Sequence, residues 1–167
     1  EDGQPVAPGA MGELTAQGEN IMIGYWKDKK ETDRVLRPEG LRTGDLARMD
    51  EDGFFYIIGR NSDMIKAGAH RISPKEIEEV IESLKEVSQC AVAGIPDELL
   101  GEKIVAFVVP TTGETLSPKQ VMRVCFENLP RFKIPAHVQI VDNLPRTETW
   151  KLRRSELRKW FKEPDTD

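Results

Sequence analysis

The chain has 167 residues with a formal net charge of −5, and 38% of its residues are hydrophobic, which suits one domain or two small ones with a buried core. The acidic balance disfavours a dedicated nucleic-acid-binding protein, and no apolar run approaches the roughly 18 residues of a membrane span, while the acidic first residues lack the pattern of a signal peptide. Cys90 and Cys125 are too few for a disulfide framework or a zinc cluster, so we expect no metal site and a reducing, cytoplasmic location.

The first 59 residues are expected to be rich in β-structure and to contain no helix. Residues 13–25 have the pattern of short strands with a turn at residues 17–20. Leu46 to Met49 and Phe54 to Ile58 flank a polar turn that ends at Gly53, which predicts a β-hairpin. We do not expect this segment to fold alone.

From about residue 60 to residue 162 the pattern alternates between helix and strand. Ser73-Pro74 with Glu76, and Ser117-Pro118 with Gln120, predict two helix starts with capping boxes, each followed by apolar residues at helical spacing. Strands are expected at residues 87–95, 104–109 and 136–141, the second of them central, and a last helix at residues 153–161. This order predicts an α+β domain with a short mixed or antiparallel sheet and about three flanking helices.

Charge is distributed unevenly along this second part. Residues 72–102 contain eight acidic and two basic residues, whereas residues 151–162 contain six basic residues and one acidic residue. The basic stretch is either the solvated face of a helix or an anion site, and charge patterning alone leaves both open. Its central members are Arg153, Arg154, Arg158 and Lys159.

Five stretches, in register, resemble the C-terminal end of the adenylate-forming superfamily, which includes acyl-CoA synthetases, peptide-synthetase adenylation domains and beetle luciferases. These stretches are residues 12–26, 41–46 (LRTGDL), 59–79 (GRNSDMIKAGAHRISPKEIEE), 91–109 and 144–157 (LPRTETWKLRRSEL). The resemblance implies that residues 1–59 end a large N-terminal AMP-binding domain, whose remainder lies upstream, so this chain alone is expected to be inactive. It also implies a hinge at residues 60–63 and a mobile C-terminal domain at residues 64–162. We further expect a disordered tail at residues 163–167.

The resemblance implies nucleotide-binding and hinge roles for three residues. Asp45, which follows Thr43-Gly44, would accept hydrogen bonds from the ribose hydroxyls. An isolated Thr-Gly-Asp is more often a turn in which the aspartate bonds its own backbone. Arg60 would also reach the nucleotide, and Asp63 would be the hinge residue at which the C-terminal domain rotates.

Residues 66–72 resemble the loop that enters the active site for the thioester-forming step. The resemblance assigns CoA or thioester-step roles to Gly68, Ala69, His70 and Arg71. Ala69 stands where the family usually has glycine, and we expect a conformational cost there because alanine disfavours positive φ. For His70, packing or lining the substrate is favoured over proton transfer.

The segment from Pro145 to Lys151 resembles the family motif Pro-x-Thr-x-x-Gly-Lys. By this resemblance the Lys151 ammonium stabilises the negative charge that develops when a carboxylate attacks the α-phosphate of ATP. Trp150 replaces the expected glycine. The sequence allows a changed path of this loop, impaired adenylation, or an introduced residue, and does not distinguish them.

The function implied is that of an AMP-forming acyl-CoA ligase, which uses ATP with Mg²⁺, a small carboxylate and CoA. One alternative is an adenylation domain that loads the thiol of a carrier protein. Another is a degenerate member that binds a nucleotide or a partner without turnover, because Ala69 and Trp150 replace glycines in both catalytic loops.

Overall fold

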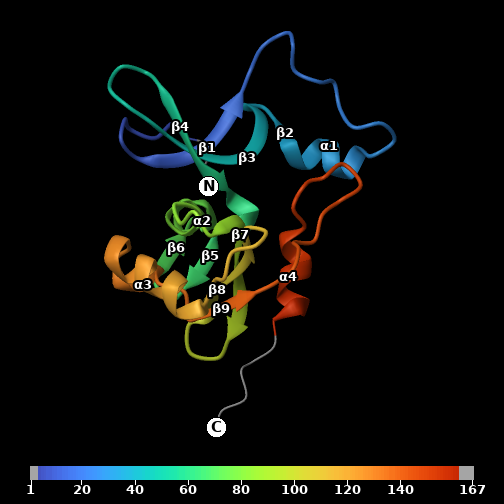
Figure 1. Ribbon diagram of the computed structural model, residues 1–167. Coiled ribbons are helices and arrows are strands. Elements are labelled where there is room, and N and C mark those ends of the chain that lie inside the picture. Colours follow the sequence, from blue (N-terminus) through green and yellow to red (C-terminus); the bar gives the residue numbers. More distant parts are fainter. Residues whose placement is uncertain (1–3, 162–167) are drawn as a thin grey trace. The chain divides into compact units, whose positions relative to one another are not determined.

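The chain divides into two compact units, Glu1–Ser62 and Asp63–Asp167, here called the N-terminal unit and the C-terminal unit (Figure 1). The computed structural model describes residues 4–161, so the tail expected at residues 163–167 lies outside the described residues. Within residues 4–161 no helix is long and apolar enough to cross a membrane.

The N-terminal unit contains an antiparallel sheet and one helix in its described part. The sheet has the strand order β1-β3-β2. Strand β4 pairs with the second half of β3, from Asp45 to Met49. The expected hairpin is confirmed, because Met49 lies opposite Phe55 and the Asp50 N–H donates to the Phe54 carbonyl over 3.0 Å. The elements are β1 (Met11–Ala16), α1 (Lys29–Val35), β2 (Leu36–Arg37), β3 (Gly40–Met49) and β4 (Phe55–Arg60).

Two expectations for this unit are wrong. Residues 21–25, which the structure describes, are not a strand, and α1 forms where no helix was expected. The helix is capped by Asp28, whose carboxylate accepts the Glu31 N–H over 2.9 Å, an ordinary N-cap contact. Val35 is its one buried residue. Because α1 has almost no apolar face, hydrophobic periodicity could not reveal it, and the cap at Asp28 was the only readable signal.

The C-terminal unit is the expected α+β domain, with a mixed sheet and three helices in its described part. The sheet has the order β6-β5-β8-β7, and β9 pairs in parallel with β8, while the other pairs are antiparallel. Strand β8 is central, as predicted. The elements are β5 (Ile65–Ala67), β6 (His70–Ile72), α2 (Pro74–Glu82), β7 (Val87–Asp97), β8 (Gly101–Pro110), α3 (Pro118–Asn128), β9 (His137–Ile140) and α4 (Arg154–Trp160).

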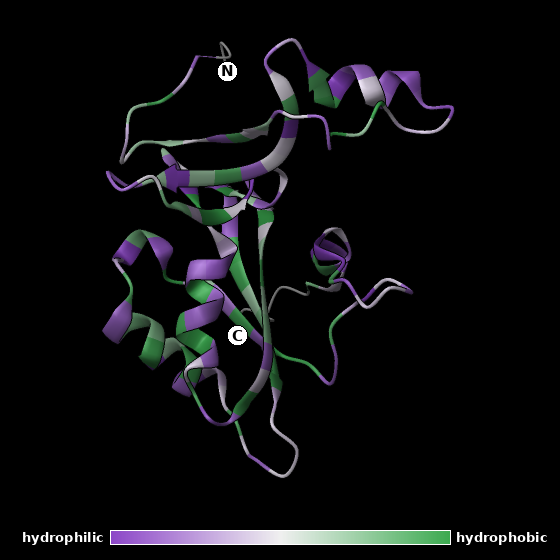
Figure 2. Cartoon of the chain, turned by 90° about the horizontal axis from the view of Figure 1, so that it is seen from above, coloured by the Kyte–Doolittle hydropathy of each residue, from purple (hydrophilic) through white to green (hydrophobic). Residues whose placement is uncertain are grey.

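Both faces of this sheet are covered by helices. On β7 and β8 alternate side chains face opposite sides, as the two-residue period of a strand requires. One set packs with α2 and α3, and the other packs against Leu157 of α4. Figure 1 shows α2 and α3 on one side of the sheet and α4 on the other, and Figure 2 shows hydrophobic colouring along the central strands. Two covered faces explain why these strands are apolar almost without interruption.

The two predicted helix starts have different physical causes. At α3 the capping box is formed: the Ser117 N–H donates to the Gln120 side chain over 2.9 Å, and Ser117 accepts the Gln120 N–H. Helix α2 begins at Pro74 as predicted, but within the described residues Ser73 gives it no side-chain cap hydrogen bond. Glu76 instead pairs with Lys133. The position of this helix start was correct and the predicted capping box was wrong.

The short hairpin β5–β6 is the element of this unit that the sequence did not predict. Each strand has three residues, and the loop between them is Gly68-Ala69. Three residues are too few for an alternating pattern to stand out. The 3-10 helices Asn61–Asp63 and Arg131–Lys133 were missed for the same reason.

Candidate functional site

Asp45 lies in a bulge of β3. Its neighbours pair with β1 as Thr15 opposite Arg42 and Glu13 opposite Leu46, so β3 has two extra residues between these pairs. Gly44 supplies the positive φ of 76° that this bulge requires. The predicted turn after Thr43 is therefore a bulge inside a strand, which changes the direction of the aspartate side chain.

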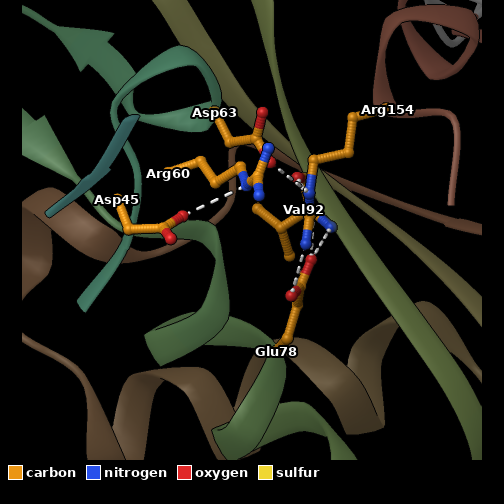
Figure 3. Close-up of polar contacts among 6 residues, drawn as sticks. All are labelled: Asp45, Arg60, Asp63, Glu78, Val92 and Arg154. Atoms are coloured by element: carbon orange, nitrogen blue, oxygen red, sulfur yellow. Dashed lines mark hydrogen bonds and ion pairs between the residues drawn. The ribbon is translucent and has the colours of Figure 1, made fainter. Parts of the chain in front are cut away.

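The Asp45 carboxylate pairs with Arg60. The two residues are opposite one another on β3 and β4, and the Arg60 Nε lies 3.1 Å from Asp45 Oδ1 (Figure 3). Arg60 is 65% exposed at its side chain and Asp45 is 29% exposed. The structure thus brings together the two residues to which the sequence assigned nucleotide contacts, and leaves the guanidinium accessible.

Asp63 and Arg154 belong to a cluster of charges in the C-terminal unit (Figure 3). The Arg154 guanidinium forms two hydrogen bonds with the Glu78 carboxylate, donates to the Val92 carbonyl over 2.8 Å, and lies 3.5 Å from Asp63. Glu78 also accepts the Val92 N–H over 2.7 Å. Burial alone would lower the pKa of Arg154, but hydrogen bonding to Glu78 and the charges of Glu78 and Asp63 outweigh it and raise the pKa.

The loop predicted to serve the thioester step is the tip of the β5–β6 hairpin. Gly68 holds the positive φ of 59°, and its N–H donates to the Leu100 carbonyl over 2.8 Å. Ala69 is not among the described residues with positive φ, so the conformational cost expected there is absent. Arg71 is exposed, and the His70 ring stacks on Phe132 with 4.2 Å between ring centroids.

Lys151 is exposed and closes a tight turn. The Thr147 N–H donates to the Lys151 carbonyl over 2.8 Å, the Lys151 N–H donates to Thr147 Oγ1 over 3.0 Å, and Arg146 pairs with Leu152 as an isolated bridge. Arg146 also donates to the Gln89 side chain over 2.6 Å. The turn that carries Lys151 is therefore attached near the start of β7.

Trp150, next to this lysine, has a left-handed backbone. Its φ is 62°, and the only other non-glycine residue with positive φ among residues 4–161 is Lys27. The Trp150 ring is 77% exposed and lies near the Arg146 guanidinium, with 5.9 Å to the ring centroid. At the position where the family motif has glycine, a bulky residue thus adopts a left-handed backbone, at a conformational cost.

Three basic residues in the described part of the stretch around α4 form ion pairs within the protein. Arg153 pairs with Glu156, Arg154 with Glu78, and Arg158 with Glu102. These contacts favour a structural role over the anion site that charge patterning left open.

The two cysteines are part of the core. Cys90 and Cys125 are buried and unbonded to each other, and burial raises the pKa of the Cys125 thiol to about 11 and that of Cys90 further. Among residues 4–161 no group of three His, Cys, Asp or Glu side chains can hold a metal ion.

Comparison with known proteins defines the class. Residues 76–151 match the model of the AMP-binding enzyme C-terminal domain. The chain belongs to the adenylate-forming superfamily and corresponds to the C-terminal portion of its members.

Particular relatives are enzymes of this superfamily. The chain is 38% identical over 158 residues to an indoleacetate–CoA ligase of Aromatoleum aromaticum, covering 95% of this chain and 31% of that protein. It matches the structure of o-succinylbenzoate CoA synthetase from Bacillus subtilis, in complex with the acyl-adenylate intermediate, with a TM-score of 0.89 at 34% identity, covering 95% of this chain and 32% of that one. An amide bond synthetase from Marinactinospora thermotolerans matches with a TM-score of 0.88 at 31% identity, covering 97% of this chain and 34% of that one. The chain spans about a third of the length of these relatives.

Proposed function

We propose that this chain is the C-terminal part of an ATP-dependent, AMP-forming acyl-CoA synthetase. The full-length protein would activate a small carboxylate as an acyl-adenylate and transfer the acyl group to CoA. Family membership supports the adenylate chemistry, and the names of the relatives support CoA as the acceptor. A cytoplasmic location belongs to the same proposal.

The observation that carries the proposal is the placement of two loops at opposite ends of one hairpin. The Lys151 turn is attached to Gln89, near the start of β7, whereas the Gly68-Ala69 loop is attached to Leu100, beyond its end. At about 3.3 Å per residue, the strand between these points spans roughly 25 Å. One reaction centre cannot contact both loops at once, so a rotation of the C-terminal unit at the hinge residue Asp63 would present them in turn.

In the first step Lys151 would act on the nucleotide. The substrate carboxylate attacks the α-phosphate, a new oxygen–phosphorus bond forms, and pyrophosphate leaves. The exposed Lys151 ammonium would stabilise the added negative charge. The Asp45 carboxylate would accept hydrogen bonds from the ribose hydroxyls, and Arg60 would contact the nucleotide. Mg²⁺ would offset phosphate charge when bound with ATP. Residues 4–161 contain no group of three or more His, Cys, Asp or Glu that could hold it.

In the second step the Gly68-Ala69 loop would line the passage of the acceptor. The CoA thiol gives up its proton to solvent and its sulfur attacks the acyl carbonyl carbon. A carbon–sulfur bond forms, the bond from that carbon to the AMP oxygen breaks, and AMP leaves. At Gly68 and Ala69 the backbone of the loop would come close to the acceptor. The stacked His70 ring would line one side of the passage, and Arg71 would provide an exposed positive charge.

The acceptor has an alternative. The likeness to an amide bond synthetase indicates that this fold accompanies acceptors other than CoA, and a carrier-protein thiol is the main alternative. A non-catalytic role remains the other alternative, and the left-handed Trp150 is the observation that favours it.

The test uses the full-length protein and a panel of carboxylates. ATP–pyrophosphate exchange measures adenylation, and CoA-dependent AMP release measures the complete reaction. Lys151→Ala should lower exchange by about 100-fold or more, as expected for loss of a charge that stabilises the transition state. Lys119→Ala, an exposed lysine on α3, should leave it unchanged. ATP–pyrophosphate exchange without CoA-dependent AMP release would favour a carrier-protein thiol as the acceptor. Absence of this exchange with every carboxylate would contradict the proposal.

A further inference from the structure

The last two residues of β5 and the glycine that follows them are attached to three consecutive residues at the tip of the β7–β8 hairpin. The Gly68 N–H donates to the Leu100 carbonyl, and Ala67 pairs with Gly101. The Lys66 N–H donates to Glu102 Oε2 over 2.7 Å. The last contact uses a side chain where a regular ladder would use the backbone, so one of the three attachments of the hairpin that carries Gly68-Ala69 depends on the position of a single carboxylate.

The Glu102 carboxylate occupies a space that Gly94 leaves open. A Cβ added to Gly94 would lie 2.8 Å from both Cδ and Oε2 of Glu102, and 3.0 Å from Ile65. Gly94 is not among the described residues with positive φ, so it is the missing side chain that matters here. The Glu102 side chain is only 17% exposed as a result.

The second oxygen of the same carboxylate is held by α4. Arg158 Nη2 donates to Glu102 Oε1 over 2.7 Å. Each oxygen therefore has its own N–H donor, one from β5 and one from α4. A charge-assisted hydrogen bond of this kind restrains a side chain more strongly than one between neutral groups.

We propose that Glu102, seated against Gly94 and held by Arg158, is a positioning residue for the acyl-transfer step. It fixes the β5–β6 hairpin and thereby the Gly68-Ala69 loop past which the acceptor thiol reaches the acyl-adenylate. This inference rests on the proposed function, because it assigns Glu102 to the second step of that reaction.

The same geometry makes the effect specific to one step. The Lys151 turn is attached through Arg146 to Gln89, at the far end of β7 from Glu102. A displaced β5–β6 hairpin leaves that attachment in place, so adenylation should continue while acyl transfer slows.

The experiment compares Glu102→Gln with Glu98→Gln in the full-length protein. Glutamine has one acceptor oxygen for two donors, so it can satisfy Lys66 or Arg158 but not both. Glu102→Gln should slow transfer from the acyl-adenylate to CoA by about tenfold or more, since a misplacement of about 1 Å can cost about 100-fold. ATP–pyrophosphate exchange should stay within about twofold. Glu98, exposed in the same turn, should have no effect on either.

Gly94→Ala is a second variant that keeps every charge. Its new methyl group pushes against the flexible end of the Glu102 side chain, so it should reproduce the slower transfer with adenylation retained. Hydrogen exchange followed by mass spectrometry gives a readout that needs no activity: in both variants residues 65–72 should exchange faster and residues 145–152 should not.

The outcomes separate the two proposals. If Glu102→Gln slows adenylation and acyl transfer equally, Glu102 has only a general structural role. Unchanged acyl transfer together with unchanged hydrogen exchange at residues 65–72 would refute the inference. A wild-type protein that never exchanges ATP and pyrophosphate would refute the proposed function, while faster hydrogen exchange in the variants would still support the anchoring role of Glu102.

Discussion

The two units of this chain bury hydrophobic side chains to very different extents. Among residues 4–161, three of the buried hydrophobic residues (Val35, Leu46 and Ala47) lie in the N-terminal unit, and the other 21 lie in the C-terminal unit. The C-terminal unit has a sheet with a packed cluster on each face. Burial of apolar surface is the main favourable term in folding, so only the C-terminal unit has an adequate core of its own.

Strand β4 shows what the N-terminal unit lacks. Four consecutive hydrophobic residues, Phe54 to Ile57, are each about half or more exposed, from 67% at Phe54 to 49% at Ile57. Adjacent exposed aromatic residues of this kind mark a surface that a folded protein normally covers. The comparison teaches that an ordered backbone ladder can be present in a segment that cannot stabilise itself.

The largest effect is expected from separating the units. Expressed alone, residues 63–167 should fold and unfold cooperatively, because their two clusters are complete within the unit. Residues 1–62 alone should show no cooperative transition. Circular dichroism during urea denaturation distinguishes the two behaviours. A cooperative transition of residues 1–62 alone, or a gradual one of residues 63–167, would overturn the comparison.

A smaller effect is expected from one buried charge within the C-terminal unit. Glu78→Ala leaves the Arg154 guanidinium buried without its main partner and should lower the free energy of unfolding by about 3–5 kcal/mol. The matched control is Glu79→Ala on the same helix, where the exposed pair with Lys75 should contribute at most about 0.5 kcal/mol. Urea denaturation of residues 63–167 measures both, and equal losses would show that the Arg154 cluster is not a buried network.

The fold could be predicted where local signals and apolar periodicity agree. Helices α2 and α3 have both, and the order of helices α2, α3 and α4 and strands β7, β8 and β9 followed from the sequence, which left open whether the sheet was mixed or antiparallel. Helix α1 and the β5–β6 hairpin could not be predicted, because one is polar on nearly all sides and the other has three-residue strands. Short elements take their stability from neighbours that are distant in sequence.

The candidate site divides in the same way. Asp45, Arg60 and Lys151 stand in contiguous motifs, so a resemblance was enough to select them. Glu78 and Glu102 were missed, because their importance comes from contacts with Arg154 and Arg158, 76 and 56 residues away. In the sequence they were two of eight acids in an acidic stretch, and only the folded chain distinguishes them from exposed neighbours such as Glu98.

The smallest expected effects on stability concern residues 69 and 150 of the C-terminal unit, the two positions where the family motifs have glycine. At residue 150, where φ is 62°, glycine should be more stabilising than alanine by about 1 kcal/mol, because side chains disfavour the left-handed region. At residue 69, which lacks positive φ, Ala69→Gly should instead cost about 0.5–1 kcal/mol. Urea denaturation of Trp150→Ala, Trp150→Gly and Ala69→Gly in residues 63–167 gives both differences.

Comparing alanine with glycine at residue 150 removes the contribution of the ring contact with Arg146, since both variants lack the ring. If glycine stabilises the protein at residue 150 and destabilises it at residue 69, the backbone strain lies at the residue before Lys151 and not in the Gly68-Ala69 loop. Equal stabilities at residue 150 would mean that this residue is not held in the left-handed region, and the turn that presents Lys151 would then have to follow a different path.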